Sequence, residues 1–227
     1  MTTVFIISAP SGSGKSTLVA ELRKIVEGLD FSVSYTTRPP RGSEQNRKEY
    51  YFVPRPEFEA MVARGEFLEH ADVFGNYYGT HRRFLAEAQR QGHDLLLDID
   101  VQGAAQIQKS TPDAVSIFVL PPNYQKLEWR LRNRGTDSKM VIRRRLDTAR
   151  REIENYTNYD YILVNDDLEQ AVDEMKAIVL AERARRSGRD GDRGNLQIAE
   201  KHRLANIRDR IKPILDSFRE AQDQERD

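Results

Sequence analysis

The chain has 227 residues, of which 38% are hydrophobic and 32% charged, with 36 basic residues balanced by 36 acidic ones and no cysteine. This length allows one sizeable domain, or one domain with an appendage, and the balanced charge gives no field that favours nucleic acid or a membrane surface. The lack of cysteine excludes disulfides, thiolate zinc sites and a thiol nucleophile. No apolar run approaches the roughly 20 residues that span a bilayer, and no basic-then-apolar leader begins the chain. We therefore expect a cytoplasmic protein with no nucleic-acid or membrane partner.

An apolar run and a helical pattern lie on either side of a short loop near the N-terminus. Residues 4–7 predict a buried strand, and apolar residues recur at helical spacing from Leu18 to Val26, with Gly28 where a helix would stop. The segment between them fits the phosphate-binding pattern GxxxxGK[ST], except that Ala9 replaces the first glycine.

This loop has the residue types that triphosphate binding requires. Glycines let backbone N–H groups turn inward around phosphate oxygens, and the helix N-terminus adds a partial positive charge. Lys15 can reach the β- and γ-phosphates, and the Ser16 hydroxyl can ligate Mg²⁺. The alternative is an ordinary Gly/Ser turn. Because the Lys-Ser pair falls at the helix start, the pattern favours a nucleoside triphosphate site.

Further apolar runs predict buried parallel strands at residues 95–97, 116–120 and 161–164, with helical patterns at 84–91 and 140–156 between them. Strands that alternate with helices indicate a parallel α/β sheet with ligands at the carboxyl ends of its strands. Residues 31 to about 85 break this order, because they alternate in polarity and contain aromatic-rich turns. We expect an inserted antiparallel lobe there.

The segment from Lys126 to Arg151 holds ten basic residues and three acidic ones in an otherwise neutral chain. Most of these side chains are explained by a solvated helix face. Beside a triphosphate loop, one or two arginines could instead close over phosphates.

Residues 187–194 form a polar, glycine-rich linker, which precedes an amphipathic helical stripe. Pro213 interrupts the stripe and should kink it or divide it into two short helices. Three alternatives stay open for this tail: packing onto the parent domain, self-association, or disorder. The stripe consists of Leu204, Ile207, Ile211, Ile214 and Phe218.

Polar residues of the inserted lobe suit a second ligand. Cationic and hydroxyl donors, as an anionic phosphate requires, are supplied by Ser34, Arg38, Arg41 and Tyr50. Glu69 can only accept hydrogen bonds while it is ionised, so it suits the N1–H and 2-amino donors of guanine, whereas the N1 of adenine is itself an acceptor. Taken singly, each of these residues could equally belong to an exposed turn or a solvated surface.

Six segments closely resemble guanylate kinase, at residues 6–17, 32–41, 67–80, 97–103, 130–136 and 164–167. The resemblance runs in order and register over about residues 3–184. It implies an α/β P-loop kinase fold with a parallel sheet core, an inserted GMP-binding lobe and a basic lid segment. It also implies ATP-dependent phosphorylation of GMP and dGMP in purine nucleotide recycling, with Mg²⁺ as cofactor.

The implied organisation is a guanylate kinase domain over residues 1–186, with a core at 1–30, 86–125 and 146–186, the GMP-binding lobe at 31–85 and the lid at 126–145. Residues 187–227, the linker and tail, lie outside the resemblance. Self-association is expected only through this tail.

Site roles follow from the resemblance residue by residue. ATP-binding positions are Ala9, Pro10, Ser11, Gly12, Ser13, Gly14, Lys15, Ser16, Thr17 and, on the adenine side, Asn165. GMP-binding positions are Ser34, Arg38, Arg41, Tyr50, Glu69, Tyr78, Gly79, Thr80 and Asp98. Catalytic charge neutralisation falls to Lys15, Arg41 and the lid arginines Arg134 and Arg145. For Mg²⁺, Ser16 is the direct ligand, and Asp98 and Asp100 act through water.

Two other functions compete with this interpretation. One is a guanylate-kinase-like binding module without catalysis, and Lys15, Ser16, Arg134 and Arg145 argue against it. The other is a kinase for a different phosphorylated acceptor, such as a sugar phosphate. Glu69, Thr80 and Asp98 argue against that one, because a sugar offers no flat donor edge.

Overall fold

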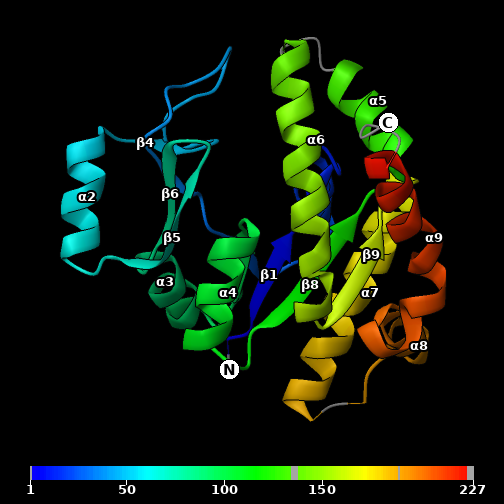
Figure 1. The fold of residues 1–227 in the computed structure, drawn as a ribbon. Helices are drawn as coiled ribbons and strands as arrows, with labels where there is room; N and C mark the ends of the chain where they lie inside the picture. The colour runs from blue at the N-terminus through cyan, green and yellow to red at the C-terminus, as the bar shows by residue number, and fades with distance from the viewer. Residues whose placement is uncertain (1, 134–137, 189, 224–227) are drawn as a thin grey trace. The chain divides into compact units, whose positions relative to one another are not determined.

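The computed structural model describes residues 2–133, 138–188 and 190–223 (Figure 1). The chain forms two compact units, each built from two stretches of sequence. Unit 1 comprises Met1–Ile6 and Glu27–Val115, and unit 2 comprises Ile7–Val26 and Ser116–Asp227.

A five-stranded sheet has the order β2-β7-β1-β8-β9, and its strand pairs β2–β7 and β8–β9 are parallel. The five strands are β1 (Val4–Ser8), β2 (Leu29–Phe31), β7 (Asp94–Asp98), β8 (Val115–Leu120) and β9 (Tyr161–Val164). Most of their side chains are buried, as near-continuous apolar runs in a parallel sheet require. The strands predicted at residues 4–7, 95–97, 116–120 and 161–164 are confirmed.

Unit 1 also holds a four-stranded sheet, in the order β4-β3-β6-β5. Its strands are β3 (Tyr35–Thr36), β4 (Tyr51–Phe52), β5 (Phe67–Val73) and β6 (Asn76–His81), and the helices of this unit are α2 (Arg55–Ala63), α3 (Arg83–Gln91) and α4 (Val101–Ser110). The β3–β6 and β5–β6 pairs are antiparallel, but β3 and β4 are parallel, so the antiparallel lobe that we predicted is a mixed sheet. The loop between β3 and β4 is long enough to bring the chain back in the same direction.

The alternating run at residues 31–35 belongs to two sheets rather than one lobe strand. Phe31 ends β2, and the Ser32 N–H donates to the Leu96 carbonyl (3.1 Å), which extends the parallel ladder before Tyr35 begins β3. Backbone pairing with β7 therefore decides the place of this run.

The helices of unit 2 that precede the tail are α1 (Lys15–Ile25), α5 (Tyr124–Asn133), α6 (Lys139–Ile153) and α7 (Leu168–Ser187). α1 packs against α7, and α5 packs against α6. The Ser138 hydroxyl accepts from the Val141 N–H at the start of α6, and Asp167 caps α7 in the same way through Gln170. The helical patterns predicted around residues 18–26, 84–91 and 140–156 are confirmed, the last ending in a 3₁₀ turn at Glu154–Asn158.

The tail forms α8 (Arg193–His202) and α9 (Leu204–Asp223), which pack within unit 2 on α7, β9 and α5 (Figure 1). Four stripe residues, Ile207, Ile211, Ile214 and Phe218, are buried there. Packing onto the parent domain is therefore the alternative that the structure shows, and self-association stays a prediction. α9 continues through Pro213, so of the two outcomes predicted there the division is wrong, and a kink stays a prediction. Burial of the flanking isoleucines outweighs the one backbone hydrogen bond that proline removes.

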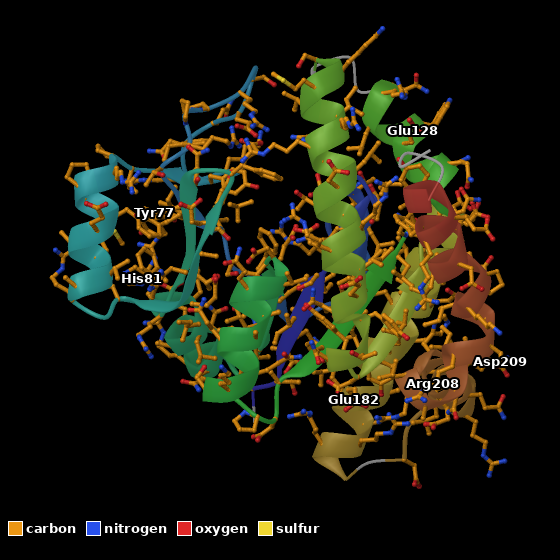
Figure 2. The ribbon with its side chains drawn as sticks, viewed as in Figure 1. Tyr77, His81, Glu128, Glu182, Arg208 and Asp209 are labelled. Carbon is orange, nitrogen blue, oxygen red and sulfur yellow. The ribbon has the colours of Figure 1, made fainter. Side chains whose placement is uncertain are left out.

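Polar contacts also hold the tail. Glu182, labelled in Figure 2, is buried on α7 and accepts hydrogen bonds from the Tyr161 hydroxyl, from Arg185 (2.6 Å) and from Arg203 (3.1 Å). His202 is 2% exposed, and its Nδ1 lies 3.0 Å from the Ile162 carbonyl oxygen. Among the helices described, none is both long and apolar enough to cross a membrane.

Candidate active site

The glycine-rich loop in unit 2 joins β1 to α1. Gly12 and Gly14 have φ values of 97° and 87°, in the left-handed region that favours glycine. A side chain at Gly12 would also press on Leu127 and Leu131 of α5, and one at Gly14 would overlap the Asn165 amide nitrogen. The loop therefore depends on its glycines for both conformation and close packing.

Two side chains from distant segments hold this loop. The Asn165 amide donates to the Ser13 carbonyl (2.7 Å), and Arg130 donates to the same carbonyl (3.2 Å) and to that of Asn165 (2.9 Å). Asn165 is 4% exposed. The sequence placed Arg130 in the basic segment and in the resembling segment 130–136 but gave it no role, and its helical position three residues after Leu127 was the available signal. The predicted adenine contact of Asn165 stays a prediction.

The loop also meets a carboxylate. Glu152 near the end of α6 accepts from the Ser11 N–H (3.3 Å), and the buried Ser13 hydroxyl has no hydrogen-bond partner among the described residues. The Ser11 N–H and the Ser13 hydroxyl both lie in the loop that we predict to receive phosphate. Glu152 is a second contact that the sequence did not single out.

Lys15, Ser16 and Thr17 occupy the first turn of α1, and Ser16 and Thr17 are exposed. Of the predicted lid arginines, Arg145 lies on α6 and is half-buried. Arg134 lies outside the described residues.

In unit 1, Glu69 on β5 pairs with Thr80 on β6 in the strand register. Their side chains are 3% and 0% exposed, and the Thr80 hydroxyl donates to Glu69 Oε1 (2.6 Å). A buried carboxylate of this kind is costly unless its acceptor sites are filled by donors. The hydrogen bond from Thr80 therefore fixes the Glu69 carboxylate as a hydrogen-bond acceptor.

The first turn of α4 lies against the same carboxylate. Asp100 caps this helix by accepting from the Gly103 N–H (2.9 Å), and a Cβ on Gly103 would overlap Glu69 Oε2. Gly103 thus makes room for Glu69, a role that the sequence did not reveal. Asp98 ends β7, two residues before this cap.

The predicted phosphate-binding residues form a second cluster in unit 1. Arg38 is 6% exposed, donates to the Tyr78 hydroxyl (3.2 Å) and pairs with Glu44 (3.0 Å). Its guanidinium lies 5.3 Å from the centroid of the Tyr50 ring, which packs edge-on against Tyr78. Burial raises the pKa of Tyr50 to about 12, so its hydroxyl stays a neutral donor near pH 7.

The structure brings Arg38, Tyr50 and Tyr78 together. It places the Arg41 side chain in solvent, with its backbone N–H on Glu44 (2.8 Å). The Ser34 carbonyl accepts from the Tyr51 N–H (2.9 Å). Gly79 packs between Phe58 and Phe67, where a side chain would crowd both rings. The sequence did not single out Glu44 as a partner of Arg38, because its only signal was its place in a polar turn.

Comparison with known proteins links the glycine-rich loop of unit 2 and the Glu69 and Arg38 groups of unit 1, here called the two half-sites, to one protein family. The family model described as guanylate kinase matches residues 1–182. A guanylate kinase of Koribacter versatilis is 57% identical and covers 97% of both chains, and one of Neisseria gonorrhoeae is 53% identical over 81% of this chain and 90% of its own. The chain belongs to the guanylate kinase family.

A crystal structure of guanylate kinase from Anaplasma phagocytophilum, 37% identical, covers 80% of this chain and 86% of its own with a TM-score of 0.66. The predicted fold, a P-loop kinase with a parallel sheet core, is confirmed. The chain is accordingly an ATP-dependent nucleoside monophosphate kinase, and the non-catalytic binding module is not favoured.

The Koribacter relative also differs from the others in coverage. Its match includes 97% of this chain, against 81% for the Neisseria protein. The guanylate kinase family model ends at residue 182, before α8 begins. The tail therefore lies outside the part that defines the family.

Proposed function

We propose that this chain transfers the γ-phosphoryl group of ATP to GMP, and that unit 1 selects guanine while unit 2 binds the triphosphate. The observation that carries this assignment is the buried Glu69 carboxylate, held by Thr80 and by the first turn of α4. Guanine offers two donors on one edge, N1–H and the 2-amino group, and Glu69 offers the matching acceptors. Adenine would place its N1 acceptor against a carboxylate.

Asp98 supplies a second carboxylate, because it lies at the carboxyl end of β7 where ligands of parallel sheets bind. The GMP phosphate is assigned to the cluster of Arg38, Tyr50 and Tyr78, together with Ser34 and the exposed Arg41. Arg38 is already oriented by Tyr78 and Glu44, so little side-chain freedom is lost when the phosphate binds. None of the residues assigned to GMP has a proposed role toward the ribose 2′-hydroxyl, which supports dGMP as a second acceptor.

The ATP phosphates are assigned to the backbone of Ser11 to Thr17 and to Lys15. Gly12 and Gly14 have the positive φ values that allow a loop to turn N–H groups toward phosphate oxygens, and Lys15 begins the helix that follows. Phosphate oxygens would replace the Glu152 carboxylate on the Ser11 N–H and supply a partner for the Ser13 hydroxyl.

The residues present suit Mg²⁺ bound together with ATP. In residues 2–133, 138–188 and 190–223 there is no group of three acidic or histidine side chains that could hold a metal by itself. Mg²⁺ prefers oxygen ligands and keeps several waters while it binds substrate phosphates, and the exposed Ser16 hydroxyl at the start of α1 supplies one oxygen. When bound, the ion would neutralise phosphate charge. Asp98 and Asp100 are assigned to its waters, and Asp100 is also the cap of α4.

The reaction needs no general base, because the phosphate of GMP is already ionised near pH 7. A GMP phosphate oxygen attacks the γ-phosphorus in line, and ADP leaves. Catalysis then rests on positioning and on charge neutralisation by Lys15, Arg41, Arg134 and Arg145. The cytoplasmic location and the role in purine recycling stay predictions.

The deciding experiment measures ADP release from the purified chain with ATP and Mg²⁺ and, separately, GMP, dGMP, AMP, CMP, UMP or no acceptor. Turnover with GMP and dGMP, and almost none otherwise, is expected. Equal turnover with AMP would contradict the role of Glu69. ATP loss without acceptor would show that water reaches the γ-phosphate.

A further inference from the structure

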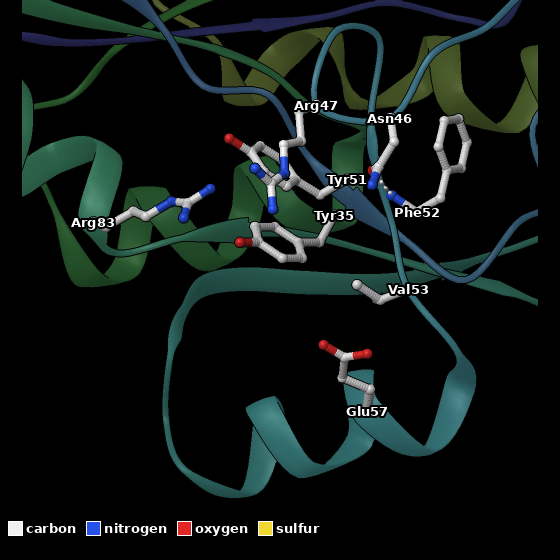
Figure 3. A pocket seen from close by; sticks show the side chains of 8 residues that line it. All are labelled: Tyr35, Asn46, Arg47, Tyr51, Phe52, Val53, Glu57 and Arg83. Atoms are coloured by element: carbon white, nitrogen blue, oxygen red, sulfur yellow. Dashed lines mark hydrogen bonds between the residues drawn. The ribbon is translucent and has the colours of Figure 1, made fainter.

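A pocket in unit 1 contains none of the predicted substrate-binding residues. Its volume is about 390 Å³, within the roughly 300–1,000 Å³ typical of small-molecule sites. Figure 3 shows Arg47 over the rings of Tyr35 and Tyr51, Arg83 to their left, and Glu57 on α2 below them.

The pocket borders the GMP-phosphate cluster at Phe52, which lines the pocket and whose ring centroid lies 5.9 Å from the Arg38 guanidinium carbon. Successive side chains of a strand point to opposite faces. Tyr35 and Tyr51 pair in register and line the pocket, whereas their neighbours Ser34 and Tyr50 belong to the predicted GMP site. The two tyrosines and two arginines of the pocket are therefore distinct from the residues of the predicted GMP site, although the two regions adjoin.

Arg83, the first residue of α3, is stacked on both tyrosines. Its guanidinium carbon lies 4.6 Å from the centroid of Tyr51 and 5.5 Å from that of Tyr35. Its Nη2 is buried and has no hydrogen-bond partner in the described part of the chain. A buried donor without a partner destabilises the protein unless a ligand or water pairs with it.

Arg47 supplies the second cation from a strained backbone. Its φ of 70° lies in the left-handed region, which is unfavourable for a residue with a side chain and is held here by its N–H on the Tyr50 carbonyl (2.7 Å). Such strain gathers at ligand-binding positions. Burial raises the pKa of Tyr35, and the charges of Arg83 and Arg47 oppose that rise, so both cations act on one hydroxyl.

We propose that this pocket binds a small organic phosphate monoester, with the phosphate on Arg47 and Arg83 and a hydroxyl-bearing part toward Asn46 and Glu57. The guanidinium fork matches a phosphate in geometry and charge. Inorganic phosphate alone would leave much of the volume empty, and Glu57 and Asn46 can pair with hydroxyl groups. The proposal does not depend on the activity proposed above.

The test is a titration with ribose 5-phosphate, followed through the arginine Nε–H signals in a ¹H–¹⁵N spectrum. GMP and a non-hydrolysable ATP analogue with Mg²⁺ are present in excess, so that the substrate sites are filled. A saturable shift of the Arg83 signal is expected. No saturable shift up to about 10 mM would overturn the proposal, as would equal binding of unphosphorylated ribose or of inorganic phosphate.

Variants then locate the site. Arg83→Gln should weaken binding of ribose 5-phosphate at least tenfold. The matched control is Arg55→Gln, because Arg55 is also stacked on a tyrosine, Tyr77, but lies outside the pocket; it should leave binding unchanged. Arg47→Gly keeps the experiment decisive if Arg83→Gln does not fold. It should weaken binding without lowering Tm, since glycine relieves the strained φ. Unchanged affinity in both pocket variants would overturn the proposal.

Discussion

The two half-sites of this kinase are built in different ways. The proposed triphosphate loop in unit 2 is one continuous segment, with Gly12 and Gly14 in left-handed conformations, and its backbone is assigned to the phosphates. The proposed guanine site in unit 1 is made of side chains from separate strands, with Glu69 and Thr80 joined by a hydrogen bond and almost fully buried.

This difference follows from what each site must recognise. Triphosphates differ little in their charged part, so a ring of backbone N–H groups and one lysine suffices. A base is recognised by the pattern of donors and acceptors on its edge, which requires side chains fixed in position. Changes in the ATP half-site should therefore alter rate, and changes in the GMP half-site should alter selectivity.

The largest expected effect is on the rate side. Lys15→Ala should lower kcat about 10³-fold, or ~4 kcal/mol, because it removes a positive charge from the transferring phosphoryl group. Steady-state kinetics and GMP binding by calorimetry measure it, and GMP affinity should hardly change. Lys24→Ala on the same helix is the control, since Lys24 is exposed and pairs with the nearby Glu21. A change confined to KM would contradict the assigned role.

The next effect is on selectivity. Glu69→Gln should lower the preference for GMP over AMP about 100-fold, or ~3 kcal/mol, because the amide can turn a donor toward the donors of guanine. The ratio of kcat/KM for the two acceptors measures it. Glu66→Gln, at an exposed pair with Arg64, should leave the ratio unchanged. Retained discrimination in the Glu69 variant would remove Glu69 from base recognition.

A smaller effect in the same direction is expected from Gly103→Ala. The added methyl would displace the Glu69 carboxylate, and the GMP/AMP ratio should fall about tenfold, or ~1.4 kcal/mol. KM for ATP should stay the same, which distinguishes a positioning role from general loss of structure. Ala105→Ser, exposed on the same helix, is the control. Equal changes in the kinetics of both substrates would contradict this role.

The smallest effect tests the support of the ATP loop. Arg130→Gln should raise KM for ATP about fivefold, or ~1 kcal/mol, because the Ser13 and Asn165 carbonyls lose a charged donor. KM for GMP should not move. Arg132→Gln is the matched control on α5, because Arg132 is more exposed and pairs with Glu128. A changed GMP/AMP ratio together with an unchanged KM for ATP would contradict the assignment of Arg130 to the ATP half-site.

The ease of prediction differed between the half-sites for the same reason. The ATP loop is local in sequence, so its glycines, lysine and serine could be recognised from spacing alone. The GMP residues lie on several strands, and singly each fitted an ordinary surface. Only a resemblance over six segments linked them, and their roles still await the tests above.

Some contacts had no signal in the sequence. Gly103 lies 34 positions from Glu69 in the chain, and Glu152 meets Ser11 across 141 positions. Such pairs depend on how helices pack, which hydrophobic periodicity does not specify. The four-stranded sheet is mixed rather than antiparallel, and α9 is not divided at Pro213, because pairing and burial outweighed local polarity and the proline.

The sequence by itself determined the strands of the parallel sheet, the helices beside them and the triphosphate loop, because each is encoded by neighbouring residues. The tertiary structure alone decided which groups fix the Glu69 carboxylate, which side chains hold the loop, and that the tail packs within unit 2. Those outcomes depend on contacts between distant residues, whose free energies arise only when burial brings the partners together.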